Sequence, residues 1–157
     1  MSRETKDNVL MAILGATFFL NMIIINLFPP IIEKLVVVGY IILGIGALFF
    51  VLSVFTLRQK GTSHIVDRGI YGIVRHPMYL GAMVMFFSHV FFGQNWIVVI
   101  STIIAIMCCH FIIKSGDQRN IEKKFGEDYK IYMQKVPGMN FFAGIVRLIE
   151  CRKSEEK

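Results

Sequence analysis

The chain has 157 residues, of which 55% are hydrophobic and 18% are charged, and its mean hydropathy is +0.60. This composition is typical of a single-domain membrane protein and excludes an ordinary soluble globular domain. The net charge of +6 would suit nucleic acid. The basic residues cluster beside apolar runs, however, which favours a membrane surface with anionic lipid headgroups and no nucleic-acid partner.

Four apolar runs predict four transmembrane helices, at residues 8–28, 35–57, 78–92 and 96–113. The first two are long enough to cross a hydrocarbon core of about 30 Å, since a helix rises about 1.5 Å per residue. No signal-peptide cleavage site follows the first run, so we expect it to be a retained span. The last two runs are shorter and predict a helical hairpin.

The basic residues are distributed unevenly between the two sides of these spans. Of the 17 Lys and Arg residues, only Lys34 lies between the first two spans. If the spans alternate in direction, all the others lie on the opposite side. The positive-inside rule therefore places both termini and the loop 58–76 in the cytoplasm.

Beyond Lys114 the chain becomes charged. Apolar side chains recur there at helical spacing, which predicts an amphipathic helix over 117–135 on the cytoplasmic side. These side chains are Ile121, Phe125, Tyr129 and Tyr132. Residues 141–149 are apolar but too few to span a bilayer, so they predict a short interfacial helix. The predicted fold is an all-α, polytopic membrane protein with one domain over 1–157.

The three cysteines, Cys108, Cys109 and Cys151, form no Cys-x-x-Cys pair. Two of them are adjacent inside an apolar run, where cysteine acts as a small apolar residue. We therefore expect neither a disulfide framework nor a metal site.

A crowded group of polar side chains lies between the second and third runs, in residues 69–81. A structural interpretation is open: Arg75 reaches lipid headgroups, Pro77 begins a helix, and Tyr79 belongs to an aromatic belt. A functional interpretation is also open, because polar groups at a membrane edge are costly unless they are used. The segment 117–135, on the same side, offers acidic and aromatic partners.

Two motifs in this order resemble a known enzyme family. Gly69-x-Tyr71…Arg75-His76-Pro77-x-Tyr79-x-Gly81 is followed by Phe125-Gly126-x-x-Tyr129-x-x-Tyr132-x-x-x-Val136-Pro137. The pattern resembles the isoprenylcysteine carboxyl methyltransferase and phospholipid methyltransferase superfamily of integral membrane enzymes. The ending Val136-Pro137…Phe141-Phe142-x-Gly144 is similar to the isoprenylcysteine branch.

The resemblance implies S-adenosyl-L-methionine as the cofactor, bound on the cytoplasmic side by the elements 69–81 and 114–137. Asp117 and Gln118 stand where family members usually carry adjacent glutamates, and they would belong to the cofactor site. Arg75 would lie near the reacting groups. The other cofactor-binding residues implied by position are Tyr71, His76, Pro77, Tyr79, Gly81, Tyr129 and Tyr132.

The expected reaction is methyl transfer to a lipid-like acceptor, and the carboxylate of a prenylated cysteine is favoured. A carboxylate is already ionised at pH 7 and needs orientation, which the guanidinium of Arg75 can supply. An amine or thiol acceptor must lose a proton, and His76 is the group placed to take it. Three alternatives stay open: a phospholipid N-methyltransferase, an NADPH-dependent sterol-reductase-like enzyme, and a non-catalytic membrane protein.

Overall fold

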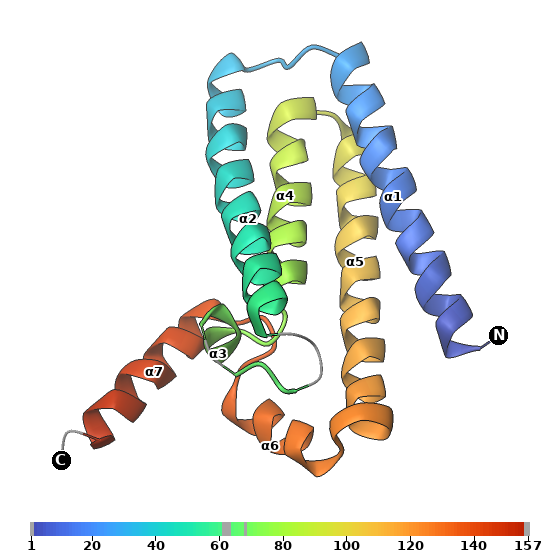
Figure 1. Ribbon diagram of the computed structural model, residues 1–157. Coiled ribbons are helices and arrows are strands. Elements are labelled where there is room, and N and C mark those ends of the chain that lie inside the picture. The colour runs from blue at the N-terminus through green and yellow to red at the C-terminus, as the bar shows by residue number, and fades with distance from the viewer. Residues whose placement is uncertain (1, 61–63, 68, 156–157) are drawn as a thin grey trace.

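The computed structural model describes residues 2–60, 64–67 and 69–155, and every regular element in these ranges is a helix (Figure 1). The predicted all-α class is confirmed. The predicted loop 58–76 falls partly outside the described residues, at 61–63 and 68. The elements are α1 (Arg3–Leu27), α2 (Glu33–Lys60), α3 (Ile70–Ile73), α4 (Pro77–Gly93), α5 (Trp96–Arg119), the π-helix η1 (Asn120–Phe125), α6 (Glu127–Lys135) and α7 (Phe141–Glu155).

Four long helices form an elongated bundle (Figure 1). α4 packs between α2 and α5, and α1 packs along α5. The α1–α2 and α4–α5 connections lie at one end of the bundle. The N-terminus, α3, α6 and α7 lie at the other end, which we call the basic end (Figure 1).

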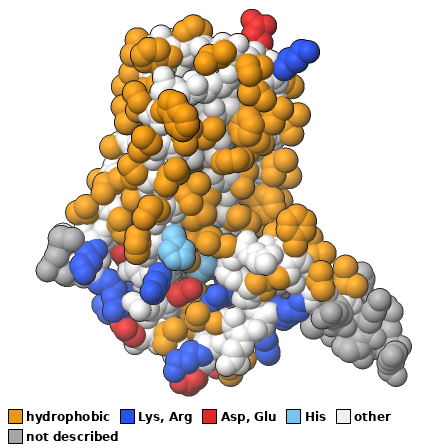
Figure 2. Space-filling model, turned by 180° about the vertical axis from the view of Figure 1, so that it is seen from behind, with side chains coloured by type: hydrophobic (Ala, Val, Ile, Leu, Met, Phe, Trp, Pro, Cys, Tyr) orange, Lys and Arg blue, Asp and Glu red, His pale blue; other side chains and the backbone are white. Residues whose placement is uncertain are grey.

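The outside of the bundle is apolar. α1, α2 and the continuous helix Trp96–Phe125 are each long and apolar enough to cross a membrane, whereas α4 is a shorter apolar helix of 17 residues. Large side chains such as Phe19 and Ile103 are exposed on the bundle surface. Figure 2 shows hydrophobic side chains covering the bundle and most of the visible charged ones at the basic end. These features support a multi-pass membrane protein.

α5 corrects the predicted end of the fourth span. The change from apolar to charged residues after Ile113 predicted a separate helix over 117–135. Instead, α5 continues without interruption and η1 extends it to Phe125. The helix breaks only at Gly126, whose φ of 56° disfavours side chains with a Cβ. A change of polarity marks the membrane surface, but the helical hydrogen bonds continue beyond it.

The C-terminal helix is also longer than predicted. The apolar run 141–149 predicted a short interfacial helix, and α7 continues to Glu155. Gly144 of this helix lies so close to the carbonyl group of Ile73 in α3 that a Cβ atom would not fit between them. α7 is therefore docked against α3.

Two glycines bring α2 and α4 together. A Cβ atom at Gly81 would lie 2.7 Å from the carbonyl oxygen of Gly46 and 2.8 Å from the backbone nitrogen of Phe50. Backbone atoms cannot turn aside as a flexible side chain can, so this contact needs glycine. By contrast, a Cβ atom at Gly44 would meet no described atom within 4 Å.

A central polar cluster, formed by Asn21, His89 and Ser101, joins α1, α4 and α5 inside the bundle. Asn21 is fully buried. Its Nδ2 lies 3.2 Å from Nδ1 of His89, and the hydroxyl of Ser101 donates a hydrogen bond to its Oδ1. Because each partner comes from a different helix, the cluster holds the three helices together.

Candidate active site at the basic end

The segments that carry the two predicted motifs lie side by side. The backbone N–H of Arg75 donates to the carbonyl oxygen of Pro137 at 3.0 Å, and that of His76 donates to Gly138 at 3.2 Å. Pro77 is the first residue of α4 and is buried. A proline at this position begins the helix with its φ already set, so it fixes Arg75 and His76 at the base of α4.

The carboxylate of Asp117 is the centre of the site. Its Oδ1 accepts a hydrogen bond from the hydroxyl of Tyr129 at 2.6 Å and lies 2.9 Å from Nε2 of His76. Its Oδ2 lies 3.6 Å from Nη1 of Arg75. The side chains of Arg75, His76 and Asp117 are only 11%, 11% and 14% exposed. We call Arg75, His76, Asp117 and Tyr129 the charged cluster.

Asp117 lies beyond the apolar run 96–113, and its neighbours keep it ionised. Burial acts to raise the pKa of Asp117, but hydrogen bonds from His76 and Tyr129 and the charge of Arg75 outweigh burial and lower it. An ionised carboxylate can only accept hydrogen bonds, so Nε2 of His76 carries the shared hydrogen. Burial, together with the hydrogen bond to Asp117, raises the pKa of Tyr129 to about 12.

A second set of hydrogen bonds connects α6 to α2 through α3. The hydroxyl of Tyr132 donates to the carbonyl oxygen of Tyr71 at 2.7 Å, and the hydroxyl of Tyr71 lies 2.7 Å from Oγ of Ser53. Burial raises the pKa of both phenols. These bonds fix α6 against the bundle and so place Tyr129 beside Asp117.

The charged cluster borders an open cavity of about 230 Å³. Nε and Nη1 of Arg75 are buried, and no described residue accepts a hydrogen bond from either of them. Buried donors without an acceptor are costly, and a ligand that accepts a hydrogen bond from Arg75 would offset this cost. The lining residues are Leu57, His64, Ile65, Val66, Tyr71, Arg75, His76, Met78, Tyr79, Asn120, Lys124, Phe125, Tyr129 and Tyr132.

The predicted site residues divide into two groups. Those that line the cavity are Tyr71, Arg75, His76, Tyr79, Tyr129 and Tyr132; Asp117 is hydrogen-bonded to His76 and Tyr129 and ion-paired with Arg75. Pro77 and Gly81 are buried in α4, where Gly81 packs on α2. Gln118 lines a different cavity, between α1 and α5. A role in cofactor binding stays a prediction for all of these residues.

The sequence reasoning missed Asn120 and Lys124, which reach the cavity from η1. They follow Asp117 at intervals of three and four residues, which is helical spacing on one face. That spacing was the available signal. The apolar residues of the same segment form a stronger periodic pattern, which hides this polar face in the sequence.

A comparison with protein families decides the relationship of the chain. The sequence model of the family described as phospholipid methyltransferase matches residues 31–128. The chain belongs to this family. The matched range runs from the residues just before α2 into α6 and contains Arg75, His76 and Asp117. No curated protein and no solved structure matches the chain.

Membership in the phospholipid methyltransferase family confirms the predicted superfamily of membrane methyltransferases. It also implies S-adenosylmethionine as the methyl donor. The cavity fits such a donor chemically, because its aromatic rings can stack on adenine and Asp117 beside it can balance a cation.

Proposed function

We propose that this protein transfers a methyl group from S-adenosylmethionine to the carboxylate of a membrane-embedded, prenylcysteine-like acceptor, with the charged cluster as its active site. The observation that carries this proposal is the guanidinium of Arg75 beside the cavity, whose buried Nε has no hydrogen-bond acceptor among the described residues. A guanidinium presents its N–H groups as a planar fork, which matches a carboxylate in two parallel hydrogen bonds. An acceptor carboxylate would therefore be bound and oriented by Arg75.

The donor would be held by the aromatic side of the cavity. S-adenosylmethionine, when bound, supplies a methyl group activated by the neighbouring sulfonium. The rings of Phe125 and Tyr129 are stacked, with their centroids 6.2 Å apart. The ring of Tyr132 is tilted against that of Tyr129, at 5.8 Å. They would provide the surface for adenine, and Asp117 would attract the positive charge.

The chain's own residues would contribute mainly by alignment. A carboxylate acceptor is ionised at neutral pH, so no residue has to remove a proton from it. Holding two reactants in position can lower a barrier by about 7–11 kcal/mol. In this role Arg75 orients the acceptor, and His76 keeps Asp117 in place through their 2.9 Å contact.

The position of the site suits reactants from two phases. The cavity lies at the basic end, next to the apolar bundle surface, so a lipid-anchored acceptor could enter from the bilayer and a soluble donor from water. We place the basic end in the cytoplasm because Lys34 alone among the 17 basic residues lies between the first two spans.

A phospholipid amine is the second candidate acceptor, and the family match favours it. An ammonium group must lose a proton before it can attack. His76 lines the cavity, and when its ring is neutral with the hydrogen on Nε2, its Nδ1 can accept that proton. The two acceptors therefore differ in which residue is essential: Arg75 for a carboxylate, His76 for an amine.

The donor is tested first, by calorimetry on the purified full chain in neutral detergent. We expect S-adenosylhomocysteine to bind with one site per chain and NADPH not to bind. Binding of NADPH without S-adenosylhomocysteine would reject methyl transfer in favour of a reductase.

The acceptor is tested next, with labelled methyl donor and either a prenylcysteine or phosphatidylethanolamine. We expect label in the prenylcysteine as a base-labile methyl ester. Arg75→Lys keeps the charge but loses the fork, so transfer should fall by roughly a hundredfold, whereas His76→Asn should lower it less. Base-stable label in the phospholipid, with the reverse order of the two variants, would select the amine.

A further inference from the structure

A second cavity, of about 370 Å³, lies between the N-terminal part of α1 and the end of α5. We call it the α1–α5 groove. It shares no lining residue with the cavity of the charged cluster. Its lining residues are Arg3, Lys6, Asp7, Leu10, Phe111, Lys114, Ser115 and Gln118.

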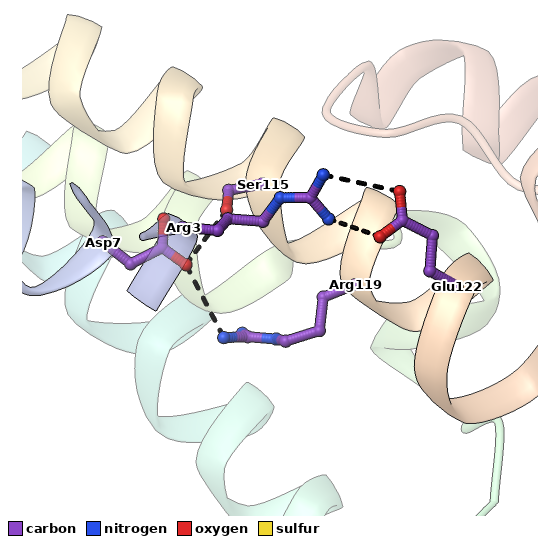
Figure 3. A network of polar contacts seen from close by, with 5 residues as sticks. All are labelled: Arg3, Asp7, Ser115, Arg119 and Glu122. Carbon is purple, nitrogen blue, oxygen red and sulfur yellow. Dashed lines mark hydrogen bonds and ion pairs between the residues drawn. The ribbon is translucent and has the colours of Figure 1, made fainter. Parts of the chain in front are cut away.

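Two of its charged residues are already paired with neighbours at one side of the groove (Figure 3). Arg3 donates to both carboxylate oxygens of Glu122, at 2.6 and 3.4 Å. Asp7 accepts a hydrogen bond from Ser115 at 3.0 Å and lies 3.6 Å from Arg119. Each of these charges is therefore offset by an opposite one, and together they fasten α1 to α5 and η1.

Unlike Arg3 and Asp7, the two lysines of the groove have no charged partner among the described residues. Lys6 and Lys114 are exposed, and neither forms an ion pair or a side-chain hydrogen bond with any described residue. Because the other charges in the groove are offset, these two give it a net positive charge. An anion could therefore bind there without displacing an existing partner.

Next to the two lysines, on the side toward the middle of the bundle, the groove is lined by apolar side chains. Leu10 follows Lys6 by about one turn of α1, and Phe111 precedes Lys114 by about one turn of α5. Seen from the basic end, the apolar part of each helix starts just beyond its lysine. The lysines therefore lie at the depth of lipid headgroups, and the apolar side chains lie where acyl chains begin. A cationic site directly above an apolar wall has the two chemistries of an anionic lipid.

We propose that the α1–α5 groove binds one anionic phospholipid, with its phosphate between Lys6 and Lys114 and the start of an acyl chain against Leu10 and Phe111. The amide of Gln118 can donate a further hydrogen bond to the phosphate. The inference goes beyond the proposed function and does not depend on it. A lipid without an amine, such as a phosphatidylglycerol, has no nitrogen to methylate and so reports on the groove alone.

The test uses the purified full chain in neutral detergent, titrated with dioctanoyl phosphatidylglycerol and followed by native mass spectrometry. We expect one saturable lipid per chain. Lys6→Gln with Lys114→Gln should weaken binding about thirtyfold, since each lysine near a membrane surface contributes roughly fivefold. The thermal unfolding temperature without lipid should be unchanged, because neither lysine forms an ion pair with a described residue.

Matched controls separate a site from general attraction. Lys123→Gln with Lys135→Gln removes the same charge from the basic end but outside the groove, and should change binding less than threefold. Dioctanoyl phosphatidylcholine and glycerol phosphate should each bind at least tenfold more weakly than phosphatidylglycerol. Equal loss in both double variants, or equal binding of phosphatidylcholine or glycerol phosphate, would overturn the proposal.

Discussion

The central polar cluster and the charged cluster both contain a histidine with little exposed surface that contacts a side chain from another helix, yet they are built differently. His89 meets the amide of Asn21 and packs against the rings of Phe18 and Phe86, each with its centroid 5.6 Å away. His76 meets the carboxylate of Asp117, beside a guanidinium and an open cavity.

The difference concerns which polar groups are satisfied. Among the described residues, the buried side-chain polar atoms without a hydrogen-bond partner belong to Arg75 and Arg147, and none belongs to the central cluster. Polar groups that satisfy one another hold helices together. Polar groups left unsatisfied beside a cavity are arranged for something that arrives from outside. A buried histidine alone does not distinguish the two cases, but its partners do.

The sharpest test of this comparison is Asp117→Asn, which leaves Arg75 and His76 without their counter-charge. Removing one partner of a buried, hydrogen-bonded charge pair costs about 2–5 kcal/mol. We therefore expect methyl transfer to fall by roughly thirtyfold or more. Radiolabel transfer and calorimetry with S-adenosylhomocysteine measure the loss.

Gln118→Ala is the matched control, because this neighbour on α5 lines the other cavity. It should leave S-adenosylhomocysteine affinity within about twofold. A loss as large as that of Asp117→Asn would restore Gln118 to the cofactor site that the resemblance implies, and would contradict the separation of the two cavities.

Gly81→Ala tests whether Gly81 serves helix packing or cofactor binding. The new Cβ would press on the backbone of Gly46 and Phe50 at 2.7 and 2.8 Å, and overpacking costs about 1–3 kcal/mol. We expect about 2 kcal/mol lower unfolding free energy in detergent, with unchanged S-adenosylhomocysteine affinity in the folded fraction. Gly44→Ala, in open space on α2, should be neutral or slightly stabilising. Unchanged stability with weakened affinity in Gly81→Ala would instead support a cofactor role.

The sequence predicted the all-α class and the four apolar helices, because apolar run length is a local property, whereas the pairing of the two motif segments came from the resemblance to the family. It could not predict how Gly81 and Gln118 are used. Both have positions implied by the resemblance, but their contacts depend on how α4 packs on α2 and on which face of α5 each residue occupies. Asn21 escaped notice for the same reason, since its partners are 68 and 80 residues away.

Asn21→Leu tests the other side of the comparison. Hydrogen bonds between membrane helices contribute about 0.6–1.7 kcal/mol each, and this change removes the bonds to His89 and Ser101. We expect about 1–2 kcal/mol lower unfolding free energy and an unchanged turnover per folded molecule. Asn26→Leu on the same helix should have little effect, because Asn26 is exposed and bonds only the carbonyl of Met22. Loss of turnover in folded Asn21→Leu would show that the central cluster takes part in function.

Tyr129→Phe gives the smallest effect at neutral pH and a distinct one in alkali. It removes one hydrogen bond to Asp117, worth about 1 kcal/mol. The folded protein raises the pKa of this phenol from 10.0 to about 12, so the folded state keeps a proton that the unfolded state loses in this interval. Unfolding free energy should therefore fall as pH rises from 10 to 12, and more steeply in the wild type than in the variant.

Chemical unfolding at several pH values measures this slope. Tyr40→Phe is the control, because Tyr40 is exposed on α2, far from Asp117. Its slope should equal that of the wild type. Equal slopes in Tyr129→Phe and the wild type would mean that neither burial nor the bond to Asp117 raises the pKa of this phenol in the folded state. The charged cluster would then lose the bond that joins α6 to α5, while the backbone hydrogen bonds of Arg75 and His76 to Pro137 and Gly138 would still hold the two motif segments side by side.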